Sequence, residues 1–186
     1  MNIFLPNEDN IGESVKALDD VRLQKQAVEI YQLLTLAIKE QQEGKEVKAG
    51  HYHHPVYLFY KDNIKFLDFY GMMCCFEYFY RFGKSHKLTD AFGKYAGEVR
   101  DLGNGYCLFD LWAEPDYTPY YMEGSKGQPN YIRTTENVSA LFQAKLCKKW
   151  NADKSKGREP RWTNRDVPQF YKTELTHQHE DKLYCK

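Results

Sequence analysis

The chain has 186 residues, 42% of them hydrophobic and 16% aromatic, which is enough for one domain with a substantial core. Its 28% charged residues and mean hydropathy of -0.73 are typical of a soluble protein. No run reaches the roughly 18 to 20 apolar residues that span a bilayer, and the N-terminus lacks the pattern of a signal peptide. We therefore expect a cytoplasmic protein without a membrane partner.

The spacing of apolar residues predicts an all-α fold, a compact single-domain bundle of about three main helices joined by long ordered loops. The first helix is predicted to begin at Asp19 or Asp20, either of which can cap it, and to end near Glu40. Its buried stripe is predicted to consist of Leu23, Ala27, Ile30, Tyr31, Leu34 and Ile38.

A second, continuous helix is predicted over residues 55–82, because Pro55 suits a first helical position and Gly83 suits a helix end. Aromatic residues occur on most of its faces, so we expect it to be the central, buried helix. Residues 83–135 are rich in Gly, Pro and Tyr, which predicts short helices mixed with ordered loops.

A third amphipathic helix is predicted to begin near Thr134 or Thr135, where "TTEN" supplies a capping signal, and to extend to Trp150. No segment alternates between apolar and polar residues as a half-buried strand does. Residues 173–186 are polar and are predicted to form a frayed tail, which leaves residues 1–172 as the helical domain.

The cysteines and histidines favour neither a disulfide framework nor a metal centre. No CxxC pair occurs among the five cysteines, Cys74, Cys75, Cys107, Cys147 and Cys185. His51, His53 and His54 lie close together, but no second cluster of ligand residues follows at a suitable spacing. We expect no metal and no cofactor, and we interpret His54 as a residue at the start of the aromatic helix that faces a substrate.

Two sets of charged residues have helical spacing. Arg22, Lys25 and Glu29 share the face of the first helix that lies away from the apolar stripe. Two cations beside a carboxylate suit phosphate binding and acid–base chemistry, and the alternative is a solvated face with ordinary ion pairs. Glu77 and Arg81 lie four residues apart on the aromatic helix, which predicts a salt bridge in the core.

The C-terminal third of the chain is basic, although the formal net charge of the whole is zero. Residues 141–172 contain nine Lys and Arg against three Asp and Glu, whereas residues 1–50 contain six basic and nine acidic residues. The basic residues alternate with aromatic ones such as Trp150 and Trp162. Cations for phosphates and rings for unpaired bases are typical of nucleic-acid binding, and the alternative is a basic helix followed by an ordinary packed tail.

Three segments, in the same order along the chain, resemble the phage pyrimidine-dimer DNA glycosylases, also called endonuclease V, which are small all-helical DNA-repair enzymes. "DVRLQKQAVE" keeps the family's spacing from an Asp to its catalytic glutamate. "FLDFYGMMCCFEYFYR" keeps the spacing of Phe66, Leu67, Glu77 and Arg81. "QAKLCKK" followed by "PRW" is similar to a basic helix and a Pro-x-Trp turn with which the family binds DNA.

The resemblance implies a base-excision enzyme, an N-glycosylase with abasic-site lyase activity, that acts as a monomer on damaged or modified double-stranded DNA. It places the catalytic carboxylate on Glu29. The family's nucleophile is a free N-terminal amine that forms a Schiff base with deoxyribose, and here that amine belongs to Met1 or Asn2. The residues expected to bind DNA are Arg22, Lys25, His54, Lys145, Lys149, Arg161, Trp162 and Arg165.

The chain departs from the family at two basic positions near the glutamate, which are Val28 and Gln32 here, so Arg22 and Lys25 would hold the phosphates. The residues leave two alternatives open. One is a phage enzyme of the same fold that acts on modified bases in DNA without attack by the terminal amine. The other is a non-catalytic protein that binds DNA or a host partner through its basic C-terminal third.

Overall fold

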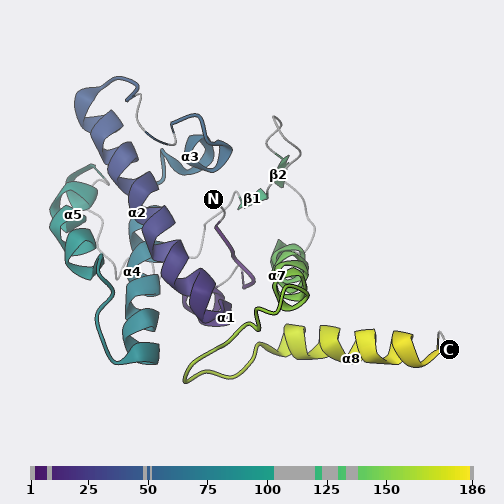
Figure 1. Cartoon of the computed structure of the whole chain (residues 1–186). Coiled ribbons are helices and arrows are strands. Elements are labelled where there is room, and N and C mark those ends of the chain that lie inside the picture. The colour runs from purple at the N-terminus through teal and green to yellow at the C-terminus, as the bar shows by residue number, and fades with distance from the viewer. Residues whose placement is uncertain are drawn as a thin grey trace.

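Two long helices, α2 (Asp20–Glu43) and α4 (Ile64–Phe82), pack against each other at the centre of the fold (Figure 1). Three shorter helices contact α4, namely α1 (Ile11–Ala17), α3 (Pro55–Tyr60) and α5 (Thr89–Leu102). The structure is a computed structural model that describes residues 3–7, 10–47, 50, 52–102, 120–122, 130–132 and 138–184. The all-α class predicted from the sequence is confirmed, although the described residues contain seven helices rather than about three.

The apolar stripe predicted for α2 faces the core. Its fully buried members are Leu23, Ala27, Ile30, Leu34 and Ile38. Tyr31 is half-buried and meets Phe92 of α5 edge-on, with the ring centroids 5.4 Å apart. The helix ends at Gly44, whose φ of 63° is a left-handed conformation that glycine adopts readily. Asp19 occupies the N-cap position, but its carboxylate makes no capping hydrogen bond.

The prediction of one continuous helix over residues 55–82 is wrong, because the helix is interrupted between the end of α3 and the start of α4. Asn63 precedes α4, and its side-chain oxygen accepts a hydrogen bond of 3.1 Å from the backbone N–H of Phe66. Such a side-chain cap supplies a partner for a helix-start N–H and so favours a new helix over continuation of the old one. The predicted end of α4 at Gly83 is confirmed, with φ at 64°.

The opposite faces of α4 differ in exposure. Phe66, Leu67 and Tyr70 are buried in the core, as expected for a central helix. Phe76, Phe79 and Tyr80 are instead more than half exposed, so α4 is not buried all round. At Gly71 a Cβ atom would lie 2.3 Å from the ring of Phe92, so glycine is what allows α5 to approach α4 this closely.

The C-terminal part of the chain adds two helices and a small hairpin. The helices are α7 (Val138–Lys154) and α8 (Gln169–Tyr184), and the strands β1 (Tyr120–Met122) and β2 (Asn130–Ile132) pair antiparallel. The predicted start of the third helix near residue 134 lies outside the described residues. Where we predicted a frayed tail after residue 172, α8 continues as regular helix to Tyr184 (Figure 1).

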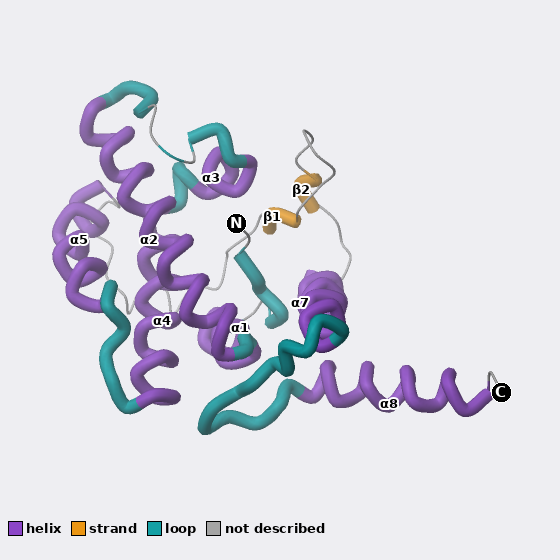
Figure 2. The backbone as a smooth tube through the Cα atoms, in the orientation of Figure 1, coloured by secondary structure: helices purple, strands orange, loops and turns teal. Residues whose placement is uncertain are grey.

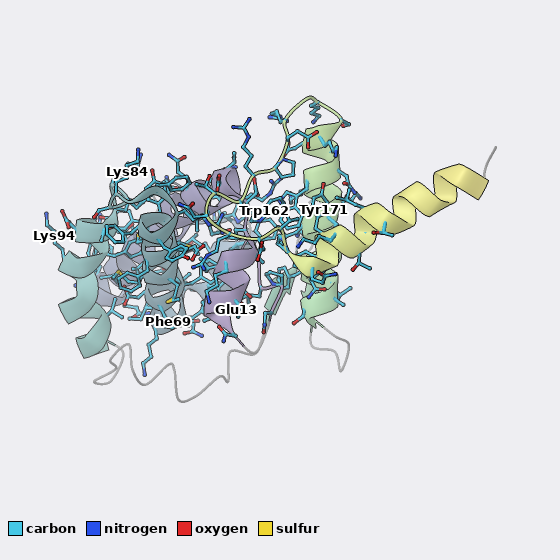
Figure 3. The ribbon with its side chains drawn as sticks, turned by 90° about the horizontal axis from the view of Figure 1, so that it is seen from below. Glu13, Phe69, Lys84, Lys94, Trp162 and Tyr171 are labelled. Carbon is cyan, nitrogen blue, oxygen red and sulfur yellow. The ribbon has the colours of Figure 1, made fainter. Side chains whose placement is uncertain are left out.

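An aromatic cluster joins α7 to α8. Trp150 of α7 is fully buried and has Trp162, Phe170 and Tyr171 around it, with ring centroids 5.0, 5.7 and 4.9 Å away. Figure 3 shows Trp162 and Tyr171 beside each other at this junction. Burial of large rings is a strong apolar contribution to stability, and Phe170 and Tyr171 lie in the first turn of α8. The cluster therefore fixes the start of a helix that is otherwise polar.

Two classes of feature are not found in the described part of the chain. None of its helices is long and apolar enough to cross a membrane. No group of three or more potential metal-binding side chains lies together among the described residues, and His51 is outside them.

Asp68 on α4 makes the stability of the fold dependent on pH. Its side chain is buried, and Oδ1 has no hydrogen-bond partner among the described residues. Burial raises the pKa of this carboxyl from 3.8 to about 6. The folded state thus keeps a proton that the unfolded chain releases near pH 4. Stability therefore falls as pH rises through this window, by about 2–3 kcal/mol in total.

We expect the substitution Asp68→Asn to remove this decline, because the amide carries no charge at any pH. Urea unfolding at about pH 4 and about pH 7.5 measures it. From about pH 4 to about pH 7.5 the free energy of unfolding of the variant should rise by about 2–3 kcal/mol relative to that of the wild type. Asp62→Asn, at an exposed position, is the control and should follow the wild type. A difference between Asp68→Asn and wild type that stays constant with pH would contradict the prediction.

Candidate functional site

A pocket of about 270 Å³ lies where α2, α7 and the N-terminal segment meet. The first described residues run between α2 and α7 (Figure 1), and Phe4 among them lines the pocket. The lining residues are Phe4, Val21, Arg22, Lys25, Gln26, Glu29, Lys149 and Asp153. The structure thus brings together Arg22, Lys25 and Glu29, predicted as one helix face, and adds Lys149 from a distant part of the chain.

Glu29 is one of the two carboxylates that line this pocket, and Asp153 is the other. Its side chain is 16% exposed, and Oε1 lies 3.4 Å from Nζ of Lys25 one turn earlier on α2. The lysine side chain is 71% exposed. An ion pair with so exposed a partner contributes little to stability. The ammonium group of Lys25 can therefore leave the Glu29 carboxylate for an incoming anion at little cost in stability.

Arg22 lines the pocket and binds two carboxylates. Its guanidinium donates to Oδ1 of Asp19 at 2.9 Å and to Oδ2 of Asp153 at 2.7 Å. The hydrogen bond from Arg22 lowers the pKa of Asp153 below its ordinary value. Oδ1 of Asp19 also accepts from Nε1 of the buried Trp150 at 2.9 Å. Arg22 and Asp19 consequently tie the start of α2 to α7 and set the distance between the two walls.

Lys149 approaches the pocket from α7. It is half-buried, and its Nζ lies 6.0 Å from the centroid of the Phe4 ring, close enough for a cation–π contact. Lys145 lies one turn earlier on the same helix and is half-buried, but it does not line the pocket. Lys148, on the neighbouring face, is exposed. The cationic groups at the pocket are therefore Arg22, Lys25 and Lys149.

A second charged cluster lies below α1 and α2, around Arg81. The Arg81 side chain is fully buried and donates to Glu77 at 2.8 Å, to Asp20 at 3.0 Å and to the backbone oxygen of Lys16 at 2.8 Å. The predicted salt bridge between Glu77 and Arg81 is confirmed. Arg165 donates to both carboxylate oxygens of Glu77, each at 2.8 Å.

The charges of this cluster compensate one another. Burial by itself would raise the pKa of Glu77, but the hydrogen bonds from Arg165 and Arg81 outweigh it and hold that pKa below the ordinary value. The Arg165 guanidinium also covers the ring of Tyr80, 3.7 Å from its centroid. The Arg165 guanidinium thus binds Glu77 through its N–H groups and stacks on Tyr80.

The connection between α7 and α8, residues 155–168, reaches back to the helical core (Figure 2). Trp162 is 8% exposed, and its Nε1 donates to the backbone oxygen of Ala17 at 2.9 Å. Thr163 donates from its hydroxyl to Asp20 at 2.7 Å, and Asn164 donates to the backbone oxygen of Arg81 at 2.8 Å. The connection therefore closes over the Arg81 cluster rather than over the pocket.

Several residues predicted to contact DNA lie away from the pocket. Trp162 is 8% exposed and lies in the aromatic cluster, so its contact with DNA stays a prediction. Arg161 is exposed, and its backbone oxygen accepts from the N–H of Asp20 at 2.8 Å. His54 caps α3 by accepting from the N–H of Val56 at 3.2 Å. Met1 and Asn2 lie outside the described residues.

The sequence analysis missed four lining residues, Phe4, Val21, Gln26 and Asp153. The sequence alone could have identified Gln26, because it lies three residues before Glu29 on the same helix. Phe4 and Asp153 could not be identified in this way, since only the packing of the N-terminal segment and α7 against α2 brings them there. A larger cavity of about 670 Å³ between α2 and Tyr95 contains none of the predicted site residues.

Residues 1–90 match the model of a protein family described as pyrimidine dimer DNA glycosylase. The matched part includes α1 to α4 and three of the pocket's charged residues, Arg22, Lys25 and Glu29. It ends before α7, which supplies Lys149 and Asp153. No curated protein and no solved structure matches the chain. The match confirms the family resemblance identified from the sequence.

Proposed function

We propose that this chain, whose residues 1–90 resemble the pyrimidine dimer DNA glycosylases, is itself a DNA glycosylase with abasic-site lyase activity. The observation that carries the proposal is the pocket that Glu29, Lys25 and Lys149 line together. A carboxylate in one pocket with two lysines suits a reaction at a sugar held between phosphates. The carboxylate comes from the segment that matches the family, and the second lysine comes from outside it.

The first chemical step assigned to the site is attack by the terminal amine on C1′ of a deoxyribose. The bond from C1′ to the base breaks, and its electron pair leaves with the base, which takes up one of the two protons that the amine loses. The C1′–O4′ bond then breaks, O4′ takes up the other proton, and the opened sugar carries an imine, the Schiff base. Phe4 lines the pocket, and three peptide units span at most about 10 Å, so an amine at residue 1 is within reach. An α-amine, with its ordinary pKa near 8, is a better nucleophile at neutral pH than a lysine.

Glu29 acts on the charge and the protons of this reaction. Its carboxylate stabilises the cationic character that C1′ acquires as the base leaves. It then accepts the proton from C2′ when the imine undergoes β-elimination, in which the C3′–O3′ bond breaks and the 3′ phosphate departs. Lys25 and Lys149 neutralise the phosphates on either side of the sugar. The amine is regenerated when water releases the product.

Four of the remaining residues predicted to contact DNA take two different roles in this proposal. Lys145 and Arg161 extend the cationic surface from Lys149 along α7 and the connection that follows, and they contact phosphates. Arg22 and Arg165 act within the protein, since their guanidinium groups already bind carboxylates. A damaged site in double-stranded DNA unstacks at lower cost than an intact one, which accounts for part of the selectivity.

Borohydride trapping tests the proposal. The purified protein is incubated with a duplex that contains an abasic site, and separately with one that contains a thymine dimer, while borohydride reduces any imine to a stable amine. We expect cleavage of both duplexes and a covalent adduct that peptide mass spectrometry locates on the terminal amine. Absence of both adduct and cleavage would overturn the enzyme proposal, and salt-sensitive binding without product would favour a DNA-binding protein instead.

Two matched variants identify the reacting amine. Lys25→Arg and Lys149→Arg keep the positive charge but remove the primary amine that a Schiff base needs. If the terminal amine is the nucleophile, both variants should still give the trapped adduct, with yields within a few-fold of the wild type. Loss of the adduct in one of them alone would assign the nucleophile to that lysine and contradict the terminal amine.

A further inference from the structure

Gln26 is a buried polar residue in the pocket whose role neither the ion pairs nor the family resemblance explains. It is 2% exposed and lines the pocket beside Glu29. Its side-chain nitrogen Nε2 has no hydrogen-bond partner in the part of the chain that the structure describes. Buried amide donors are rarely left without an acceptor, because the loss of water is then not compensated. A hydrogen-bond acceptor on a bound ligand would satisfy the Nε2 donor of Gln26.

The position of Gln26 limits which ligand atom that acceptor is. Residues three apart on a helix have Cβ atoms about 5–6 Å apart, so Gln26 reaches atoms adjacent to the one on which Glu29 acts. A phosphate is disfavoured there, because the Glu29 carboxylate repels it and the cations Lys25 and Lys149 bind it better. A neutral amide donor suits a neutral acceptor, such as the carbonyl oxygen of a base.

We propose that Gln26 donates a hydrogen bond from Nε2 to a carbonyl oxygen of the pyrimidine whose deoxyribose faces Glu29, and so recognises the base to be removed. This inference rests on the proposed function. The terminal torsion of a glutamine side chain has a broad energy profile, so a small rotation turns the buried nitrogen toward the pocket.

The test compares two duplexes in a protein that binds but does not turn over. Glu29→Gln is the parent, and Gln26→Met is added to it, because methionine has a similar shape and no donor. Fluorescence anisotropy measures the affinity for a duplex with a thymine dimer and for one with tetrahydrofuran, an abasic analogue without a base. We expect Gln26→Met to weaken binding of the dimer duplex about tenfold and to leave binding of the tetrahydrofuran duplex unchanged.

Thermal unfolding separates recognition from a structural role. Because Nε2 has no hydrogen-bond partner among the described residues, an apolar replacement should leave Tm unchanged or raise it. Gln24→Met, at an exposed position on the same helix, is the control and should alter neither affinity nor Tm. An equal loss on both duplexes, no loss on either, or a lowered Tm would overturn the inference. If the parent prefers neither duplex to undamaged DNA, the proposed function fails and the inference fails with it.

Discussion

Replacement of Glu29 by Gln is expected to reduce strand cleavage at an abasic site by at least about 100-fold, the usual contribution of a positioned acid–base group. The amide has nearly the same shape as the carboxylate, so the pocket keeps its form. It carries no charge to stabilise the sugar cation, and it cannot accept the proton from C2′. Single-turnover cleavage of a labelled duplex measures the effect, and anisotropy should show that binding persists.

Glu43→Gln is the matched control for this experiment. Glu43 lies at the end of the same helix, where it pairs with Lys39 and Lys45 at 3.7 Å and is 37% exposed. Its replacement should leave cleavage within a few-fold of wild type. If Glu29→Gln cleaves at the wild-type rate, Glu29 has no catalytic role, and the pocket described here is not the active site.

The charged face of α2 was predictable because helical periodicity is a local property of the sequence. Arg22, Lys25 and Glu29 lie on one side of a helix whose other side is apolar, and both sides follow from residue spacing alone. The break at Asn63 depends instead on one side-chain cap in a run of aromatic residues that are compatible with continuous helix. Helix α8 was missed because its anchors, Phe170, Tyr171 and Leu175, lie near its start and most of the residues after them are polar.

The roles of residues in the basic C-terminal third were less predictable, because composition does not reveal which side chains are exposed. Trp162 and Arg165 have the residue types of a DNA-binding surface, yet one is buried against Trp150 and the other binds Glu77. Lys149 belongs to the same basic segment of the sequence, but it lines the pocket. Trp162 and Arg165 are engaged within the protein because the α7–α8 connection packs on α1 and α4. That packing depends on residues far apart in the sequence.

Arg81 supports the α7–α8 connection through Glu77 and Asp20, which bind residues of that connection. Its replacement by Met is expected to destabilise the fold by about 3–5 kcal/mol. The methionine fills much of the volume but leaves Glu77 and Asp20 without the cation that lies between them. Arg165 still binds Glu77, so one carboxylate keeps part of its compensation. For a chain of this length the loss corresponds to a fall in Tm of about 10 °C or more, which calorimetry measures.

The matched control for Arg81 is Arg158→Met. Arg158 also pairs with a carboxylate, Asp153 at 3.0 Å, but its side chain is 66% exposed, so solvent replaces the lost contact. Its replacement should lower Tm by no more than about 2–4 °C. Because Arg81 does not line the Glu29 pocket, cleavage by Arg81→Met per folded molecule should stay near wild type well below its Tm. An unchanged Tm would mean that the buried carboxylates find other partners, whereas lost cleavage at full folding would place Arg81 in the reaction itself.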